Sequence, residues 1–230
     1  MPPLVCQGWG ARSIPGMQIV IPIFDGMTAL DAVGPYEVLS RLPGAEVVFA
    51  ALEPGPKRTE DEALALMADR ALTDVPSPEI IVVPGGFGTR PLMHEERMLD
   101  WLRSAHETSE WTTSVCTGSL LLGAAGILDG LRATTHWLAL DMLPDLGAEP
   151  TLERVVEQGK VITAAGVSSG IDMALRLAAH VAGDDTAQAI QLSIEYDPQP
   201  PFDAGSPEKA PAEIVDRLRG PRGRAGVTRS

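Results

Sequence analysis

Short apolar segments alternate with amphipathic segments along most of the chain. From residue 17 onward, runs rich in β-branched residues predict buried strands. Between these runs, apolar positions recur at helical spacing, as in Met98, Trp101, Leu102 and Ala105. This alternation predicts repeated βαβ units and a mostly parallel sheet. Strands are expected at residues 18–24, 46–52, 79–83, 111–115, 133–135, 152–156 and 161–164, and helices at residues 30–42, 95–109, 117–125, 137–143, 169–181 and 184–195.

The remaining segments define the limits of the expected domain. Residues 64–72 fit either a pair of short strands or an excursion from the sheet, and periodicity does not decide between them. Gly159 fits the turn between the last two expected strands. Residues 1–16 lack apolar periodicity and are expected to form a flexible extension, and residues 220–230 are expected to be a disordered tail. Without an internal repeat or a long linker, residues 17–219 are predicted to form a single domain.

Composition and charge narrow the class of protein. The 230 residues are 44% hydrophobic and 21% charged, which is typical of a globular domain. The net charge of −13 disfavours nucleic acid and anionic lipid as partners. No apolar run reaches the roughly 20 residues of a membrane span, and the start lacks a signal-peptide pattern, so a cytoplasmic location is expected. Of the two cysteines, Cys6 lies in the Gly- and Pro-rich leader, so a structural disulfide is not expected and Cys116 needs another explanation.

Cys116 lies where the expected strand at residues 111–115 turns into a helix, in the segment WTTSVCTGSLLLGAAGIL. This is the arrangement of a nucleophile elbow, in which a tight turn lifts a side chain above the sheet. Gly118 has no Cβ atom and therefore leaves space for this tight turn. The helix dipole and nearby backbone N–H donors favour a thiolate here, so a lowered pKa is expected for Cys116. The alternative is a small buried side chain that ends a core strand, and the position at the turn favours the catalytic interpretation.

Gly85 and Gly86 follow the expected strand at residues 79–83, in the segment IIVVPGGFG. Without a Cβ atom, their backbone N–H groups can face a cavity, which suits an oxyanion-binding site. A plain turn after a buried strand is the alternative, and the catalytic interpretation gains weight only beside Cys116. The segment lacks both the GK[ST] ending of a P-loop and the spacing of a dinucleotide site, so no nucleotide cofactor is predicted.

Two polar side chains are candidates to share the site with the thiol. Asp31 lies near the start of the helix after the first strand, and carboxyl ends of parallel strands share one rim, so Asp31 could exchange a proton with Cys116. A carboxylate that only stabilises the helix N-terminus is an even alternative, and Asp25 is a weaker rival. His136 could line the same site, although a structural histidine is at least as well supported. No cluster has metal-ligand spacing, so no metal is predicted.

These motifs resemble the DJ-1/ThiJ/PfpI superfamily, and specifically its isocyanide hydratase branch. The resemblance covers roughly residues 17–217 and rests on LDAVGPYEVL, PGGFG, TSVCTGSLLLGAAGIL, ATTHW, AAGVSSGIDMAL and QLSIEYDPQPPFDAGSP. It implies an α/β flavodoxin-like three-layer sandwich, related to class I glutamine amidotransferases, with helices on both faces of a mostly parallel sheet. It also implies a homodimer and no cofactor. By motif it implies Cys116 as nucleophile, Asp31 as its acidic partner and Thr117 as their neighbour, with the Gly86 and Thr117 amides near the reacting centre.

The implied reaction adds water to an isocyanide and gives an N-substituted formamide through a thioimidate on Cys116. Peptidase-like members carry His directly after the cysteine, where this chain has Thr117, so proteolysis is disfavoured. Members that resemble DJ-1 itself carry Glu in place of Asp31, and regulators of this fold append a DNA-binding domain for which the residues after Arg219 leave no room. Two alternatives stay open: a glyoxalase or deglycase that uses the same thiol, and a redox sensor in which Cys116 is oxidised without turnover.

Overall fold

The computed structural model describes residues 16–220, so the predictions made for residues 1–15, including Cys6, and for residues 221–230 lie outside it. The chain divides into two compact units, one reaching Ile194 and one beginning at Glu195. The formation of a single domain by residues 17–219 stays a prediction.

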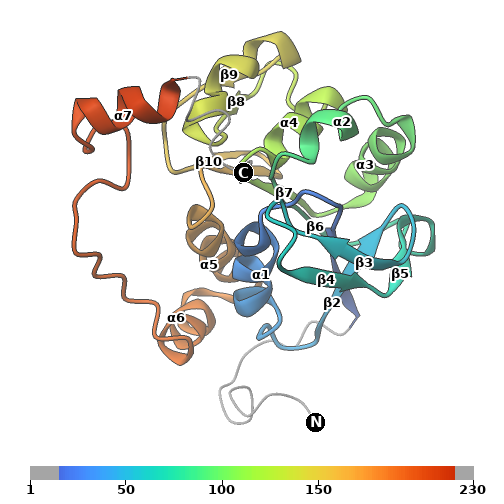
Figure 1. Ribbon diagram of the computed structural model, residues 1–230. Helices are drawn as coiled ribbons and strands as arrows, with labels where there is room; N and C mark the ends of the chain where they lie inside the picture. Colours follow the sequence, from blue (N-terminus) through green and yellow to red (C-terminus); the bar gives the residue numbers. More distant parts are fainter. Residues whose placement is uncertain (1–15, 221–230) are drawn as a thin grey trace. The chain divides into compact units, whose positions relative to one another are not determined.

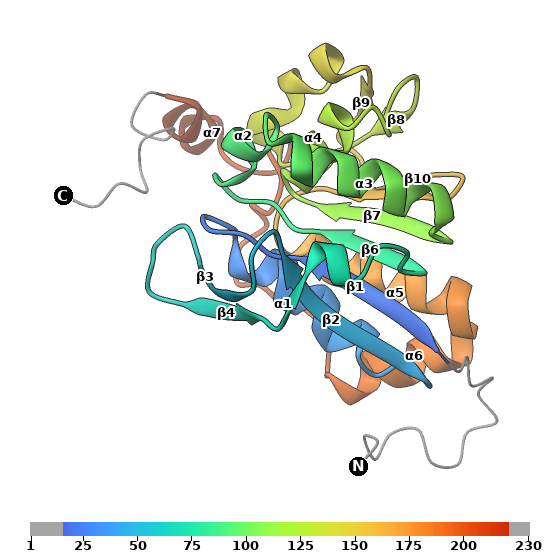
Figure 2. The same ribbon diagram turned by 90° about the vertical axis from the view of Figure 1, so that its right-hand side faces the viewer.

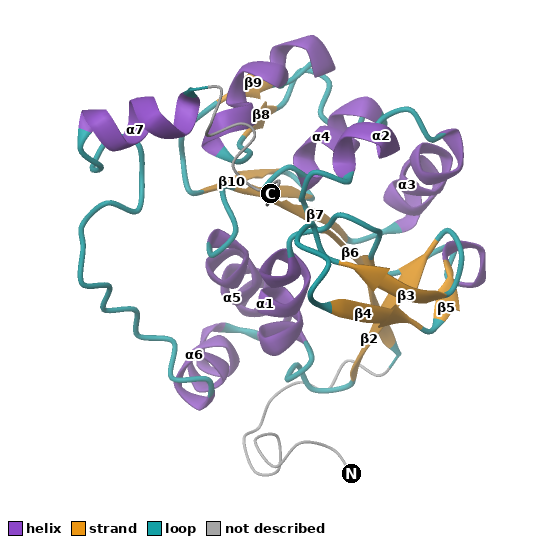
Figure 3. Ribbon diagram, in the orientation of Figure 1, coloured by secondary structure: helices purple, strands orange, loops and turns teal. Residues whose placement is uncertain are grey.

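Within the described residues, a seven-stranded sheet forms the centre of the first unit (Figures 1 and 3). Its strand order is β10-β11-β7-β6-β1-β2-β5, and every neighbouring pair is parallel except β10 and β11. The Ile- and Val-rich segments form the central strands because both faces of a parallel sheet are covered. The strands are β1 (Met17–Pro22), β2 (Ala45–Ala51), β5 (Arg70–Ala71), β6 (Ile80–Val83), β7 (Trp111–Val115), β10 (Val155–Gln158) and β11 (Val161–Ala164).

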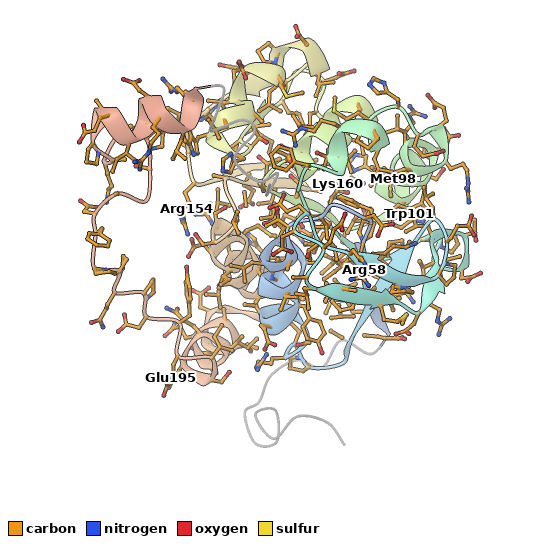
Figure 4. All side chains as sticks on the ribbon, in the orientation of Figure 1. Arg58, Met98, Trp101, Arg154, Lys160 and Glu195 are labelled. Carbon is orange, nitrogen blue, oxygen red and sulfur yellow. The ribbon has the colours of Figure 1, made fainter. Side chains whose placement is uncertain are left out.

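Helices cover both faces of this sheet, with α1 and α5 on one face and α3 and α4 on the other (Figure 2). The apolar stripe expected on α3 is buried: Met98 and Trp101 both lie on it (Figure 4), and the Trp101 indole N–H donates to the carbonyl of Val75. The predicted three-layer α/β sandwich is therefore confirmed. The helices of this unit are α1 (Ala29–Leu39), α2 (Thr89–Leu92), α3 (Glu96–Thr108), α4 (Gly118–Ala124), α5 (Ser169–Ala182) and α6 (Asp184–Ser193).

The segment that periodicity left open, residues 64–72, forms short strands. β3 (Gly55–Arg58) and β4 (Ala65–Ala68) pair as an antiparallel hairpin outside the main sheet, whereas β5 joins the edge of that sheet. A 3₁₀ helix, η2 (Leu72–Asp74), follows. Most of the hairpin's side chains are exposed or half-buried, which explains why no clear apolar pattern marks it.

The connection between α4 and β10 departs most from the expected elements. The strand expected at residues 133–135 is shorter: β8 (Arg132–Ala133) pairs only with β9 (Glu149–Pro150), in a separate two-stranded sheet. The expected helix near Trp137 is two 3₁₀ segments, η3 (Trp137–Met142) and η4 (Pro144–Leu146). Gly159 occupies the turn between β10 and β11 with a φ of +60°, as predicted.

The second unit contains a helix, α7 (Ala212–Arg219), that is absent from the elements expected from the sequence. Pro211 precedes it, Glu213 lies in its first turn, and Arg217 and Arg219 lie in its last turn. This order of charges complements the helix dipole. Across residues 16–220, every helix falls short of the length and apolar character that crossing a membrane requires.

The parallel strands β1, β6, β7 and β11 end at the same edge of the sheet. β1 leads toward α1 with Asp31, and β6 leads into Gly85 and Gly86. β7 leads directly into Cys116, and β11 leads into residues 165–168. Ligands of open parallel sheets bind at this edge, and the sequence-predicted site residues converge there.

Candidate active site

Cys116 occupies a strained turn between β7 and α4. Its φ of +55° is unusual for a residue other than glycine, and several hydrogen bonds hold it. The Cys116 N–H donates to the carbonyls of Ala164 and Ala165, and its own carbonyl accepts from the hydroxyls of Ser119 and Thr135. The backbone is therefore that of a nucleophile elbow, and the side chain is 5% exposed.

Gly118 allows the elbow to approach the end of β6. A Cβ atom on Gly118 would lie 2.1 Å from the carbonyl oxygen of Val83, which is far inside van der Waals contact. Gly85 is equally constrained, because its Cβ would lie 2.4 Å from the backbone nitrogen of Thr117. Both glycines are thus required by close packing between the β6 loop and the elbow.

Asp31 is the carboxyl group that this packing places beside the thiol. It is fully buried on α1, its Oδ2 accepts a 2.9 Å hydrogen bond from the Gly85 N–H, and it is hydrogen-bonded to the Cys116 thiol. Among the described residues, its Oδ1 has no hydrogen-bond partner. The rival Asp25 is exposed and accepts instead from the Arg58 N–H at 2.8 Å. Geometry therefore selects Asp31 over Asp25 as the partner of Cys116.

The buried position changes the acidity of Asp31. Burial raises the pKa of Asp31 from 3.8 to about 7, and the nearby charge of Glu60 acts in the same direction. Hydrogen bonds from Gly85 and Cys116 oppose this rise in pKa without cancelling it. A carboxyl group with a pKa near neutrality exchanges its proton readily in both directions, which suits acid–base chemistry.

The expectation of a lowered pKa for Cys116 is wrong. Burial, followed by the charge of Asp31, raises the pKa of Cys116 from 9.0 to about 12. The N–H groups of Val167 and Thr117 donate to the sulfur and lower the pKa, but burial outweighs them. Above about pH 7 and below about pH 12 the pair therefore holds one proton, with a thiol that donates to the Asp31 carboxylate.

The Gly85 and Gly86 amides have a different use from the one expected. Neither faces open space: the Gly85 N–H donates to Asp31, and the Gly86 N–H donates to the Thr117 hydroxyl at 2.9 Å. The Thr117 Oγ1 also lies 3.1 Å from the Gly86 carbonyl, and the buried hydroxyl of Thr89 lies 3.3 Å from it. These hydrogen bonds position the Asp31 carboxyl group and the Thr117 hydroxyl. The N–H groups that donate to the Cys116 sulfur are instead those of Thr117 and Val167.

Val167 is a part of the site that the sequence does not reveal. Its φ is +26°, outside the conformations that a β-branched residue normally adopts, and its N–H donates to the Cys116 sulfur. No sequence signal marks a valine in this conformation, because the strain is imposed by the surrounding fold.

His136 lies against the same turn. A Cβ atom on Gly166 would lie 2.9 Å from the His136 Cδ2, so the ring packs directly on the residue that precedes Val167. The His136 Nδ1 accepts a 3.3 Å hydrogen bond from the Leu138 N–H. Burial, with a contribution from Arg90, lowers the pKa of His136, so the ring is neutral near pH 7.

Arg90 is the second residue that sequence reasoning missed. Its Nη1 donates to the Gly86 carbonyl and to the Thr89 hydroxyl, both at 3.1 Å, and its guanidinium carbon lies 5.3 Å from the centre of the Phe87 ring. Burial lowers the pKa of Arg90, whereas interactions with Cys116 and Glu60 raise it. The only sequence signal is a basic residue shortly after PGGFG, which is too common a feature to indicate a site.

The arrangement supplies the groups for nucleophilic addition coupled to proton transfer. Cys116 offers a sulfur nucleophile, Asp31 can accept its proton and return it, and two backbone N–H groups stabilise negative charge on the sulfur. Within residues 16–220, no group of three or more His, Cys, Asp or Glu residues could hold a metal ion.

A mostly parallel sheet with helices on both faces is the flavodoxin-like class of fold, and here it carries a cysteine at a strained strand-to-helix turn. The chain belongs to the DJ-1/PfpI family, whose model matches residues 17–180. It is 48% identical over 205 residues to the isonitrile hydratase of Pseudomonas putida, covering 88% of this chain and 89% of that protein.

Solved structures give the same assignment. A THiJ/PfpI family protein from Pseudomonas syringae superposes with a TM-score of 0.90 at 34% identity, covering 97% of this chain and 93% of that one. Oxidised DJ-1 of Toxoplasma gondii shares the fold with a TM-score of 0.70 at 23% identity, covering 80% of this chain and 100% of that chain. The resemblance to the DJ-1/PfpI family predicted from the motifs is thereby confirmed.

Proposed function

We propose that the protein is an isocyanide hydratase, a hydro-lyase that adds water to an isocyanide and gives an N-substituted formamide. The observation that carries this proposal is the buried Asp31 carboxyl group, which is hydrogen-bonded to the Cys116 thiol and has one oxygen without a partner among residues 16–220. The 48% identity to an isonitrile hydratase, another name for the same activity, supports the choice of substrate class. We expect the enzyme to act as a cytoplasmic homodimer without a cofactor.

The first step adds the Cys116 S–H across the terminal carbon of the isocyanide. Asp31 takes the thiol proton, and the sulfur forms a bond to the carbon, which is electrophilic toward a soft nucleophile. The carbon becomes basic as it is attacked and receives the proton back from Asp31. One bond of the carbon–nitrogen triple bond is lost, and the product is a thioimidate with a C–H bond.

The second step hydrolyses this thioimidate. The Asp31 carboxylate, whose Oδ1 has no partner among the described residues, accepts a proton from a water molecule while the water oxygen attacks the thioimidate carbon. The nitrogen receives that proton, and the carbon becomes tetrahedral. The carbon–sulfur bond then breaks, the hydroxyl proton returns to the Cys116–Asp31 pair, and the formamide leaves.

The Thr117 and Val167 amides assist both steps in this proposal. The sulfur carries most negative charge when it is about to attack and when it is expelled, and hydrogen bonds from both N–H groups favour its charged form. Preorganised donors of this kind stabilise developing charge more effectively than water, because they need no reorientation. The role of Thr117 is to keep this amide in place through its hydroxyl contacts with Gly86.

The test is formamide production from cyclohexyl isocyanide by the wild type and three variants. We expect turnover by the wild type, none above background for Cys116→Ala, and a loss of at least about 100-fold for Asp31→Asn. Asp25→Asn is the matched control, because it removes an exposed carboxylate and should keep the wild-type rate. Turnover of methylglyoxal but not of the isocyanide would contradict the proposal and favour a glyoxalase.

A further inference from the structure

Arg90 is a half-buried cation that has no ion pair among the described residues, in a chain with a net charge of −13. Several other arginines of the first unit pair with carboxylates, as Arg97 does with Glu53 at 2.7 Å. Across residues 16–220, the guanidinium of Arg90 makes no such ion pair; it donates instead to a carbonyl and a hydroxyl, through Nη1 alone. Because a charge withdrawn from water requires compensation, this group suits an anionic ligand.

The position of Arg90 ties it to the reacting centre. Its two acceptors, the Gly86 carbonyl and the Thr89 hydroxyl, belong to residues that also contact the Thr117 hydroxyl, at 2.9 and 3.3 Å respectively. Gly86 and Thr89 thus each connect Arg90 to Thr117, the residue that follows the nucleophile Cys116. Its electrostatic interactions with Cys116 and His136 place its charge within the field of the site.

The Arg90 side chain is held in one orientation, and some of its N–H groups have no hydrogen-bond acceptor among the described residues. The guanidinium lies over the Phe87 ring, which is 49% exposed, and Nη1 fixes it to the loop. Nε and Nη2 make no hydrogen bond to any described protein atom. A guanidinium presents its N–H groups as a planar fork that matches the two oxygens of a carboxylate.

Glu60 is the carboxylate of the protein that interacts with the Arg90 guanidinium and so competes with an anionic ligand. It interacts with both Arg90 and Asp31, yet its Oε1 is directed to the Thr28 hydroxyl, at 3.4 Å. Glu60 therefore weakens the positive field at the site without neutralising the guanidinium through direct contact.

We infer that Arg90 forms a carboxylate-binding subsite beside Cys116, so that the preferred substrates are isocyanides that carry a carboxylate. This inference rests on the proposed function and names its substrate class. The guanidinium would hold the carboxylate through Nε and Nη2, and the isocyanide group would then reach the sulfur. The enzyme would then select substrates by the distance between their isocyanide and carboxylate groups.

The experiment compares isocyanoacetate and longer ω-isocyano carboxylates with their methyl esters, at fixed ionic strength. We expect the wild type to prefer at least one carboxylate over its ester by about 10- to 100-fold in kcat/KM, the range of a charge-assisted contact. Arg90→Gln should bring this ratio close to one, and Arg90→Lys should give an intermediate ratio because it keeps the charge without the fork. Arg97→Gln, an exposed site on α3, is the control for the loss of one positive charge and should keep the wild-type ratio.

Inhibition by the N-formyl carboxylate products gives a second readout that does not depend on turnover of the anionic substrate. Arg90→Gln should raise the inhibition constant at least about tenfold, and Glu60→Gln should lower it. Equal kcat/KM for carboxylates and esters in the wild type would overturn the inference while leaving the hydratase proposal intact. Absence of turnover with every isocyanide, cyclohexyl isocyanide included, would instead overturn the hydratase proposal and the inference with it.

Discussion

Replacement of Asp31 by asparagine is expected to stabilise the fold above neutral pH. Because the pKa of Asp31 is raised from 3.8 to about 7, the folded state binds its proton more tightly than the unfolded state does. The resulting contribution to stability is complete below about pH 4 and is lost as the pH rises to about 7. The difference of about three pKa units corresponds to about 4 kcal/mol of unfolding free energy.

Urea unfolding at a series of pH values measures this contribution. Other carboxyl groups titrate equally in both proteins, so the difference in unfolding free energy between Asp31→Asn and the wild type isolates Asp31. We expect this difference to shift in favour of the variant by about 2 kcal/mol between about pH 5.5 and about pH 8. Asp25→Asn controls for the loss of a negative charge at an exposed position. A difference that is constant across this range, or that shifts the other way, would refute the reasoning.

Three further outcomes are expected. The kcat/KM for isocyanide should fall about tenfold per pH unit below pH about 7, because protonation of Asp31 removes the form of the Cys116–Asp31 pair that holds one proton; a flat profile between about pH 5 and 8 would contradict this assignment. Ser114→Ala should raise the unfolding free energy by about 1 kcal/mol, measured by urea unfolding, because the Ser114 hydroxyl is buried without a hydrogen-bond partner among the described residues; a clear loss of stability would show that the hydroxyl is satisfied. Gly118→Ala should destabilise the fold by about 3 kcal/mol or more, since its Cβ would lie 2.1 Å from the Val83 carbonyl oxygen; an unchanged melting temperature would contradict the close packing of the elbow.

The central sheet could be predicted from sequence because its strands are buried on both faces. β6 (Ile80–Val83) and β11 (Val161–Ala164) are entirely buried, and such short apolar runs between helical segments have few other interpretations. The elbow could be located for a related reason, because the position of Cys116 between a strand and a helix is itself a local pattern. Because parallel strands end at the same edge of the sheet, Asp31 could be predicted to lie near Cys116.

Features that depend on contacts between distant segments could not be predicted. The hairpin of β3 and β4 lacks a buried face, and Val167 adopts its strained φ only because the fold requires it. The pKa of Cys116 was expected to be lowered by local features of the turn, whereas burial and the charge of Asp31, both set by tertiary packing, raise it. The unpaired charge of Arg90 likewise becomes visible only when every carboxylate around it has been placed.

Intact-mass analysis of the wild type, acid-quenched during turnover of cyclohexyl isocyanide, tests the central claim most directly. We expect a mass gain equal to one isocyanide molecule, located on the peptide that contains Cys116, since the S–H adds across the isocyanide carbon without loss of any atom. Asp31→Asn should form this adduct far more slowly, because the group that takes the thiol proton and returns it to the isocyanide carbon is absent, and Cys116→Ala should form none. Formamide production by Cys116→Ala at the wild-type rate, without any adduct on the quenched wild type, would contradict this mechanism.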